Sequence, residues 1–148
     1  MGQRACDPRN RLPAHDHRRR HGRAFFRAIG RVCRARTRDT AQPPNEDEYT
    51  FVYRGRIGGL VGEDEIEVEE GGLFFKPRGI VHALWNPTEH PVIVIEFISP
   101  AGFEHFFEEM GALTRAEPEA MQEIAQRYGQ QPYPDLISGL ETRHSVRL

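Results

Sequence analysis

The sequence predicts a mainly β protein, an antiparallel sandwich or barrel followed by C-terminal helices. Between Glu48 and Ser99, short runs rich in β-branched and aromatic residues are separated by glycine-containing turns at a spacing of roughly 8–12 residues. No helical periodicity interrupts these runs, and helical patterns follow them after Pro100. With 148 residues, the chain has the size of one domain.

Six strands are expected. They occupy residues 48–54, 56–62, 62–72, 73–77, 80–86 and 92–99. In the third, Ile66 and Val68 alternate with acidic residues, as on a strand that buries one face. A series of short strands with tight turns and no helices between them is typical of an antiparallel arrangement.

Helices are expected in the C-terminal third. Ser99 can cap the first helix with Pro100 at its first position, and Thr114 with Glu117 forms a capping box for the second. A third, shorter helix follows Pro134. Apolar residues recur at helical spacing in all three, namely Phe103, Phe106, Phe107 and Met110, then Met121, Ile124, Ala125 and Tyr128, then Leu136, Ile137 and Leu140. We expect the aromatic face of the first helix to pack on the strands.

The sign of the net charge changes about a quarter of the way along the chain. Residues 1–38 carry 12 arginines and 2 aspartates, a balance of +10, and residues 39–148 carry 8 basic and 20 acidic side chains, a balance of −12. We therefore expect a basic, poorly structured or atypical N-terminal segment (1–40), a barrel (41–99), and a C-terminal helical segment (100–148) that packs on the barrel.

The N-terminal segment leaves alternatives open. Apolar residues from Phe25 to Cys33 fit one helical face and also alternate tolerably as a strand. The arginines can form an arm for nucleic acid, but a solvated tail is favoured because the rest of the chain is acidic. The 19 arginines against a single lysine indicate GC-rich coding. A further hypothesis is therefore an alternative reading frame or a truncated start in place of native strands.

The chain shows no sign of export or membrane insertion. It has no run of 18 or more apolar residues, and no apolar segment follows the arginine-rich start, so we expect a cytoplasmic protein. Cys6 and Cys33 lie 27 positions apart outside any C-x-x-C motif and are expected as free thiols.

The most specific pattern is GGLFFKPRGIVHALWN, residues 71–86, which fits G-x5-P-x-G-x2-H-x3-N. Pro77 and Gly79 favour a tight turn between two strands, and this turn aims the ring of His82 inward. Upstream, Glu48 precedes a glycine with the spacing E-x6-G.

These two motifs, in this order and with a short spacer, resemble those of the cupin superfamily. NEDEYTFVYRGRIG and ISPAGFEHFFEEMG are also similar to segments of small single-domain bacterial cupins, and the resemblance covers residues 45–148. It implies an antiparallel cupin (jelly-roll) barrel. In metal-binding cupins three histidines and a glutamate hold one divalent transition metal such as Mn, Fe, Ni, Cu or Zn. The resemblance assigns Glu48 and His82 to two of these metal-ligand positions.

The chain departs from the family at the other two ligands. The family places H-x-H three or four residues before its glutamate, which here means Ala41 and Pro43, or Gln42 and Pro44. None of these is a histidine. We therefore expect a degenerate site that holds a metal weakly or not at all.

Other histidines are poor substitutes for the missing pair. His15 and His17 flank Asp16 with the right spacing but lie more than 30 residues before Glu48, among arginines that repel a cation. The remaining candidates, His90, His105 and His144, are expected to face solvent.

Two functions follow from the resemblance. The favoured one is a barrel that binds a small molecule, with Thr50, Val52 and Leu84 lining the site because they alternate with Glu48 or His82. The alternative is a mononuclear-metal-dependent enzyme, a dioxygenase or isomerase acting on a small organic substrate. No catalytic residue is assigned. We also expect a homodimer paired through strand edges or an aggregation-prone monomer, and no nucleic-acid or membrane partner.

Overall fold

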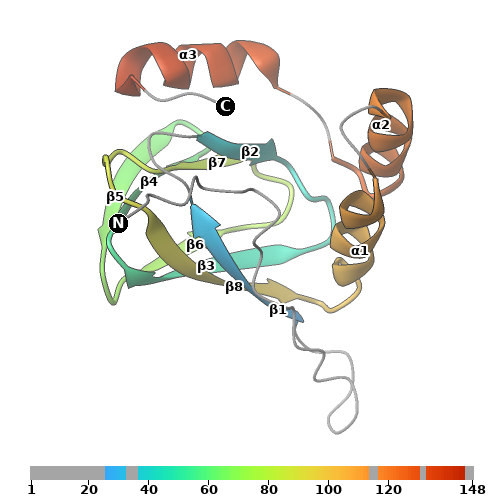
Figure 1. The fold of residues 1–148 in the computed structure, drawn as a ribbon, viewed down its shortest axis with the longest axis horizontal. Coiled ribbons are helices and arrows are strands. Elements are labelled where there is room, and N and C mark those ends of the chain that lie inside the picture. Colours follow the sequence, from blue (N-terminus) through green and yellow to red (C-terminus); the bar gives the residue numbers. More distant parts are fainter. Residues whose placement is uncertain (1–25, 33–36, 114–116, 131–132, 146–148) are drawn as a thin grey trace, which may run out of the picture.

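Two four-stranded antiparallel sheets face each other, and three helices lie outside them (Figure 1). This computed structural model describes the backbone of residues 26–32, 37–113, 117–130 and 133–145, and side chains from residue 42 onward within those ranges. The strands are β1 (Phe26–Val32), β2 (Thr37–Ala41), β3 (Asp47–Arg54), β4 (Arg56–Val61), β5 (Asp64–Glu69), β6 (Leu73–Lys76), β7 (His82–Trp85) and β8 (Val92–Ser99). The helices are α1 (Glu104–Ala112), α2 (Pro118–Arg127) and α3 (Pro134–His144).

The strand order is β1-β8-β3-β6 in one sheet and β2-β7-β4-β5 in the other. All six strands predicted from the sequence are present, as β3 to β8. Among the described strands, hydrogen-bonded pairing occurs only within each sheet. The predicted barrel is therefore present as two facing sheets that are not joined into a closed cylinder.

The sheets begin earlier than residue 41, where the sequence analysis started the barrel. Strand β1 pairs with β8 from Phe26 opposite Ile98 to Val32 opposite Val92. Strand β2 pairs with β7. Both satisfy backbone groups that β8 and β7 would otherwise expose at a sheet edge. Of the two alternatives for residues 25–33, the strand is correct for 26–32.

The core between the sheets is built by alternate residues of the strands. It comprises Val52, Ile57, Phe74, Leu84, Val92 and Val94, all at most 5% exposed. Two adjacent glycines of β4 allow aromatic rings to pack against both faces of this strand. A Cβ at Gly59 would lie 2.6 Å from Cζ of Phe74, which reaches across from the other sheet, and a Cβ at Gly58 would lie 2.1 Å from the Trp85 indole on the opposite face. Only glycine lets both rings lie against the strand.

Helix α3 covers the outer face of the β2-β7-β4-β5 sheet (Figure 1). Its Leu140 is fully buried against Leu60, Ala83 and Trp85. The His144 ring stacks on Trp85 with 4.5 Å between the ring centroids.

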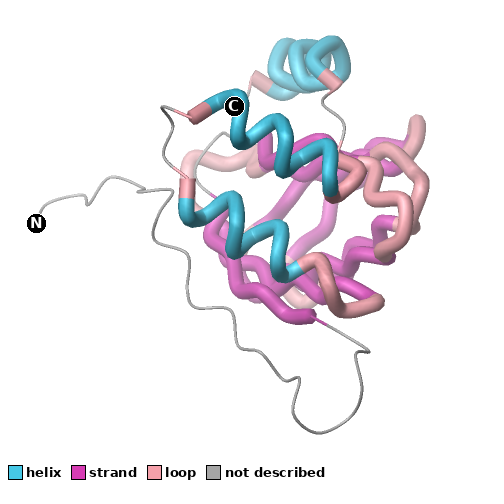
Figure 2. The backbone as a smooth tube through the Cα atoms, turned by 90° about the vertical axis from the view of Figure 1, so that its right-hand side faces the viewer, coloured by secondary structure: helices cyan, strands magenta, loops and turns pink. Residues whose placement is uncertain are grey.

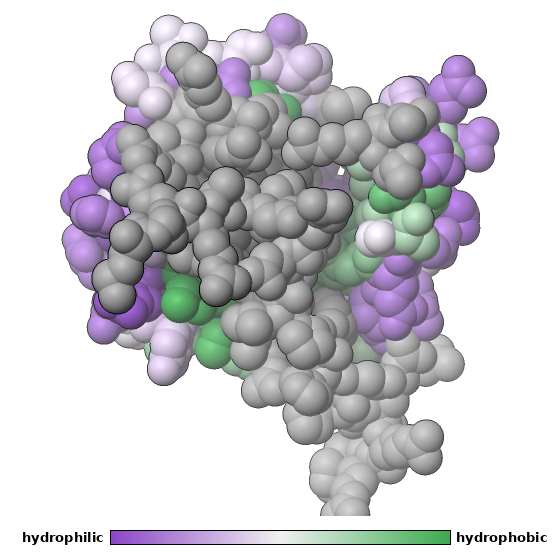
Figure 3. Space-filling view, in the orientation of Figure 1, coloured by the Kyte–Doolittle hydropathy of each residue, from purple (hydrophilic) through white to green (hydrophobic). Residues whose placement is uncertain are grey.

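Helices α1 and α2 form a separate layer beside the sheets (Figure 2). Phe103, just before α1, is 4% exposed and packs on Ile98 of β8, with Phe106, Phe107 and Tyr128 around it. In Figure 3 the outward side of this layer is mostly hydrophilic and apolar side chains lie toward the sheets. The aromatic face predicted for the first helix is thus the face that packs on the sheet.

The predicted start of the first helix is wrong by several residues. The helix begins at Glu104 instead of Pro100, because Gly102 has a φ of +138°, which is outside the helical region. The Gly102 N–H donates to the carboxylate of Glu104 at 2.5 Å. Helix α2 begins at Pro118, and the proposed cap Thr114 lies outside the described residues. Helix α3 is present where it was predicted, but it begins at Pro134 itself and with 11 residues is the longest of the described helices, not the shortest. None of the helices in the described ranges has the length and apolarity needed to cross a membrane.

The glycine pair of β4 gives a stability prediction. Replacing Gly59 with alanine should lower the free energy of unfolding by about 1–3 kcal/mol, because the new methyl group forces the buried Phe74 ring to move. Gly58→Ala should lower the free energy of unfolding in the same way, because its methyl group would displace the Trp85 ring. The measurement is urea unfolding followed by tryptophan fluorescence.

Gly111→Ala is the matched control. A Cβ there meets no atom within 4 Å, and the residue lies within α1. Alanine should leave the stability unchanged or raise it by up to about 1 kcal/mol. Equal stabilities for Gly59→Ala and Gly111→Ala would contradict the packing account.

Candidate functional site

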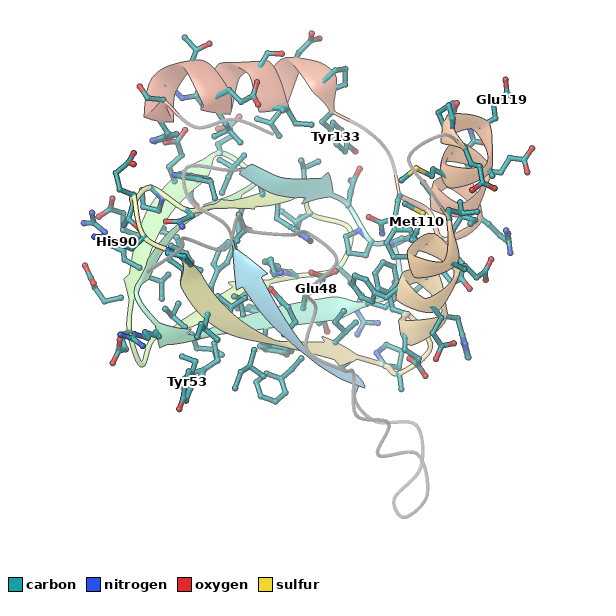
Figure 4. The ribbon with its side chains drawn as sticks, viewed as in Figure 1. Glu48, Tyr53, His90, Met110, Glu119 and Tyr133 are labelled. Carbon is teal, nitrogen blue, oxygen red and sulfur yellow. The ribbon has the colours of Figure 1, made fainter. Side chains whose placement is uncertain are left out.

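The site lies on the inner face of the β1-β8-β3-β6 sheet. Strand alternation turns Glu48, Thr50 and Val52 of β3 inward, and all three are buried. Figure 4 shows Glu48 in the space between the two sheets, whereas Tyr53 of the same strand points away from it. The neighbouring strands bring Lys76 and Glu96 to the same face, because β6 places Lys76 opposite Glu48 and β8 places Glu96 opposite Thr50.

Lys76 is the centre of a buried ionic cluster. Its Nζ donates to Oε2 of Glu48 at 2.8 Å and to Oε2 of Glu96 at 3.1 Å. The hydroxyl of Thr50 donates to the other oxygen of Glu96 at 2.7 Å. Lys76 is 4% exposed, and its ammonium lies 6.0 Å from the centroid of the Phe74 ring. One cation is therefore shared by two carboxylates from different strands.

His82 approaches this cluster from the facing sheet. It is 3% exposed, and its Nε2 lies 3.5 Å from Oε2 of Glu48. Its Nδ1 lies 3.2 Å from the carbonyl oxygen of Ile80, which can only accept, so Nδ1 carries a proton. The ring thus presents Nε2 to the interior, as the motif predicted.

The cluster keeps its charges despite burial. Burial alone raises the pKa of Glu48, but the ammonium of Lys76 and the imidazole of His82 outweigh it and lower the pKa from 4.5 to about 2. Burial likewise lowers the pKa of Lys76, but Glu48 and Glu96 outweigh it and raise the pKa above the ordinary 10.5. Carboxylate and ammonium are therefore both charged near neutral pH.

The turn before His82 has the geometry that the motif implied. The N–H of Ile80 donates to the carbonyl of Pro77 at 3.3 Å, and Gly79 has a φ of +70°. The Gly79 N–H also donates to the carbonyl of Pro43 at 2.8 Å, which ties the turn to the segment after β2. The last motif residue, Asn86, is fully buried and holds the next turn by donating to the carbonyl of His90 at 2.7 Å.

The structure places the expected H-x-H positions beside His82. Ala41 of β2 is directly opposite His82 of β7. Gln42 donates to the carbonyl of Gly79 at 2.8 Å and accepts from the hydroxyl of Tyr133. These positions thus lie beside His82, where further metal ligands are expected, but alanine, glutamine and prolines occupy them.

The other histidines have partners elsewhere. His105 lies 3.0 Å from Glu108 on the exposed side of α1, and His144 lies 2.9 Å from Glu65. His90 lies at the edge of the molecule, far from Glu48 in Figure 4. His15, His17 and both cysteines lie outside the described residues.

The predicted lining residues occupy two environments. Thr50 belongs to the ionic cluster through its hydrogen bond to Glu96. Val52 and Leu84 both belong to the apolar core between the sheets. Their role as ligand-binding residues stays a prediction.

Sequence reasoning missed Lys76 and Glu96. A signal was available for both, because Lys76 shares a strand face with Phe74, and Glu96 shares one with Val94 and Ile98. A charged residue on the apolar face of a strand indicates a buried charge with a partner.

Comparisons with known proteins identify the fold. The cupin domain of Schizosaccharomyces pombe Cnp3 superposes with a TM-score of 0.51 at 13% identity, covering 66% of this chain and 67% of that one. The chain has the cupin fold. KdgF from a Halomonas species gives 0.53 at 17% identity, covering 58% and 77%. A protein with a double-stranded β-helix domain from Klebsiella pneumoniae gives 0.52 at 13%, covering 62% and 75%.

Sequence comparison adds little to this cupin assignment. An uncharacterized protein of Streptomyces coelicolor is 30% identical over 66 residues, which are 45% of this chain and 63% of that protein. The match thus spans less than two thirds of the relative. No family model matches the chain.

The cupin metal does not fit the side chains of this site. Within the described part of the chain, no group of three or more histidine, cysteine or acidic side chains is placed to hold a metal ion. Glu48 and His82 are adjacent, but the ammonium of Lys76 already binds the Glu48 oxygen that faces His82. A divalent cation there would be repelled by the ammonium at close range.

The ionic cluster gives a pH prediction. Because the pKa of Glu48 is about 2 in the folded protein against an ordinary 4.5, its carboxylate stabilises the fold above pH 4.5. This contribution, at most about 3 kcal/mol, is lost as the pH falls from 4.5 toward 2. Urea unfolding at pH 7, 4 and 3 should therefore show a steep acid loss in the parent protein.

Glu48→Gln should be less stable at pH 7 and lose less stability on acidification. Glu119 lies on the exposed side of α2 (Figure 4), and Glu119→Gln should keep the parent acid slope. An unchanged acid slope in Glu48→Gln would contradict the assignment.

Proposed function

We propose that this cupin-fold chain binds a small polar organic molecule between its sheets, without a tightly held metal. The observation that supports the proposal is the ionic cluster of the buried Glu48, Lys76 and His82 with the part-buried Glu96. Replacing buried ion pairs with apolar residues is often neutral or stabilising, so their presence in a core favours a use beyond folding. The side chains of Glu48 and Glu96 remain 11% and 14% exposed, which leaves some of their surface within reach of a solute.

The charges of the cluster favour a class of ligand. Two carboxylates face a single ammonium, and carboxylate oxygens only accept hydrogen bonds when ionised. A ligand with hydroxyl or amino donors complements them, and Thr50, Val52 and Leu84 would line its site. The cytoplasmic location expected from the sequence stays part of this proposal.

The alternative is a mononuclear-metal-dependent dioxygenase or isomerase. It is favoured by the 3.5 Å approach of His82 to Glu48 and by the register that puts Ala41 opposite His82. It is disfavoured by Lys76, whose ammonium occupies the carboxylate that a metal would need.

A ligand screen tests the favoured proposal. Small polyols, sugar acids, amines and phenols would be tested by thermal unfolding of the full chain, and any compound that raises the melting temperature would be titrated by calorimetry. Thr50→Val removes the hydroxyl that binds Glu96 at nearly constant volume, so it should weaken binding at least about tenfold. Thr142→Val, on α3 and exposed, should bind as the parent does. Equal affinity in both variants would exclude this site.

We also propose that the protein forms a homodimer, through a sheet face instead of the strand edges expected from the sequence. The outer face of β3 and β6 exposes Tyr53 at 60%, Leu73 at 57% and Phe75 at 46%, and Phe75 stacks on Tyr49 at 4.8 Å. Aromatic side chains gathered on one face are typical of interfaces.

Sedimentation at micromolar concentration tests the dimer. The parent should sediment as a dimer, and the double variant Leu73→Glu, Phe75→Glu as a monomer, because a second copy would bury the new charges. Ile66→Glu, at a 42% exposed position of β5 in the other sheet, should remain dimeric. A monomeric parent, or dissociation by Ile66→Glu alone, would count against this face.

A further inference from the structure

Lys76 is the only lysine in a chain with 19 arginines, and it is buried at the centre of the site. Among the described residues, its Nζ is bound by carboxylate oxygens of Glu48 and Glu96, at 2.8 and 3.1 Å. These two side chains come from the neighbouring strands β3 and β8, and they converge on one point. The point of convergence is a cation site, and the ammonium fills it.

Physical chemistry explains why some cation must be there. Two buried carboxylates near one another are unstable as ions unless a positive charge neutralises them. A divalent metal or an ammonium can do this. A compact ammonium on a flexible stem suits a single point between two oxygens, whereas the planar, wider guanidinium of arginine does not.

We infer that the ammonium of Lys76 is a built-in cation that excludes a divalent metal from the position between Glu48 and Glu96. The inference deepens the proposed metal-free function, and it concerns only residues of this chain. Removing the side chain of Lys76 leaves the two carboxylates that converge on its ammonium, and carboxylate oxygens suit Mn²⁺. Loss of the ammonium should therefore create Mn²⁺ binding that the parent lacks.

The first experiment observes Lys76 directly in the unmodified protein. Selective ¹⁵N-lysine labelling gives one side-chain resonance, because the chain has one lysine. Adding one equivalent of paramagnetic Mn²⁺ should leave this resonance sharp. Severe broadening at one equivalent would place the metal beside the ammonium and overturn the inference.

The second experiment measures the gain of metal binding. Free Mn²⁺ would be followed by its electron paramagnetic resonance signal while each protein is titrated with the metal. Lys76→Ala should bind about one equivalent at least about tenfold more tightly than the parent, and its melting temperature should rise with Mn²⁺. The double variant Lys76→Ala, Glu48→Gln should lose the gain.

Arg127→Ala is the matched control, because it removes a cation 2.8 Å from Glu109 on the exposed side of the helices. It should gain no Mn²⁺ binding. A folded Lys76→Ala that binds Mn²⁺ no better than the parent overturns the inference.

If Lys76→Ala does not fold, the same titration would be carried out on Lys76→Gln. The amide side chain keeps much of the volume of lysine and can still donate hydrogen bonds, but it carries no positive charge. A rise in its melting temperature with Mn²⁺ supports the inference, and an unchanged value counts against it. No organic ligand enters these assays, so their outcome is independent of the ligand screen.

Discussion

Buried carboxylates require a buried positive charge, and the interior between the two sheets is organised around the one that Lys76 provides. Its ammonium joins Glu48 of β3 to Glu96 of β8, and through Glu48 it meets His82 of the facing sheet. The contact therefore links three strands of one sheet to the other sheet. The Coulombic attraction of the same ammonium is also the largest single effect that lowers the pKa of Glu48 in spite of burial.

The apolar core and this polar cluster occupy successive positions along the same strand faces. On β3, Val52 packs in the core while Thr50 and Glu48, two and four residues earlier, belong to the cluster. Phe74 and Lys76 divide β6 in the same way. The approach of the sheets that brings His82 near Glu48 depends on Gly59, against which the Phe74 ring lies. Packing at one end of the strands thus sets the distance between polar groups at the other.

Much of the fold was predictable because its signals are local. Strands β3 to β8 are short runs bounded by glycine, and the turn at Gly79 needs a positive φ that the sequence pattern implied. The inward direction of Glu48 and His82 followed from alternation and from the cupin motifs. The start of α1 was mispredicted because Gly102, between Pro100 and the helix, adopts a conformation that no helix continues through. The N-terminal strands were ambiguous because their pattern fits two periods and only pairing with β8 and β7 selects one.

By itself, the sequence determined the class of fold, the order of the strands along the chain and the turn that presents His82, since each depends on residues close together. It also showed that histidine is missing from the positions beside His82. Only the tertiary structure decided which positive charge lies between Glu48 and Glu96. Lys76 lies 28 residues from Glu48 and 20 from Glu96, and its place on the Phe74 face of β6 indicates a buried charge but not its partners. The pairing of β6 and β8 with β3 makes it a buried cation, because sheet register, which no local pattern contains, determines which charges meet.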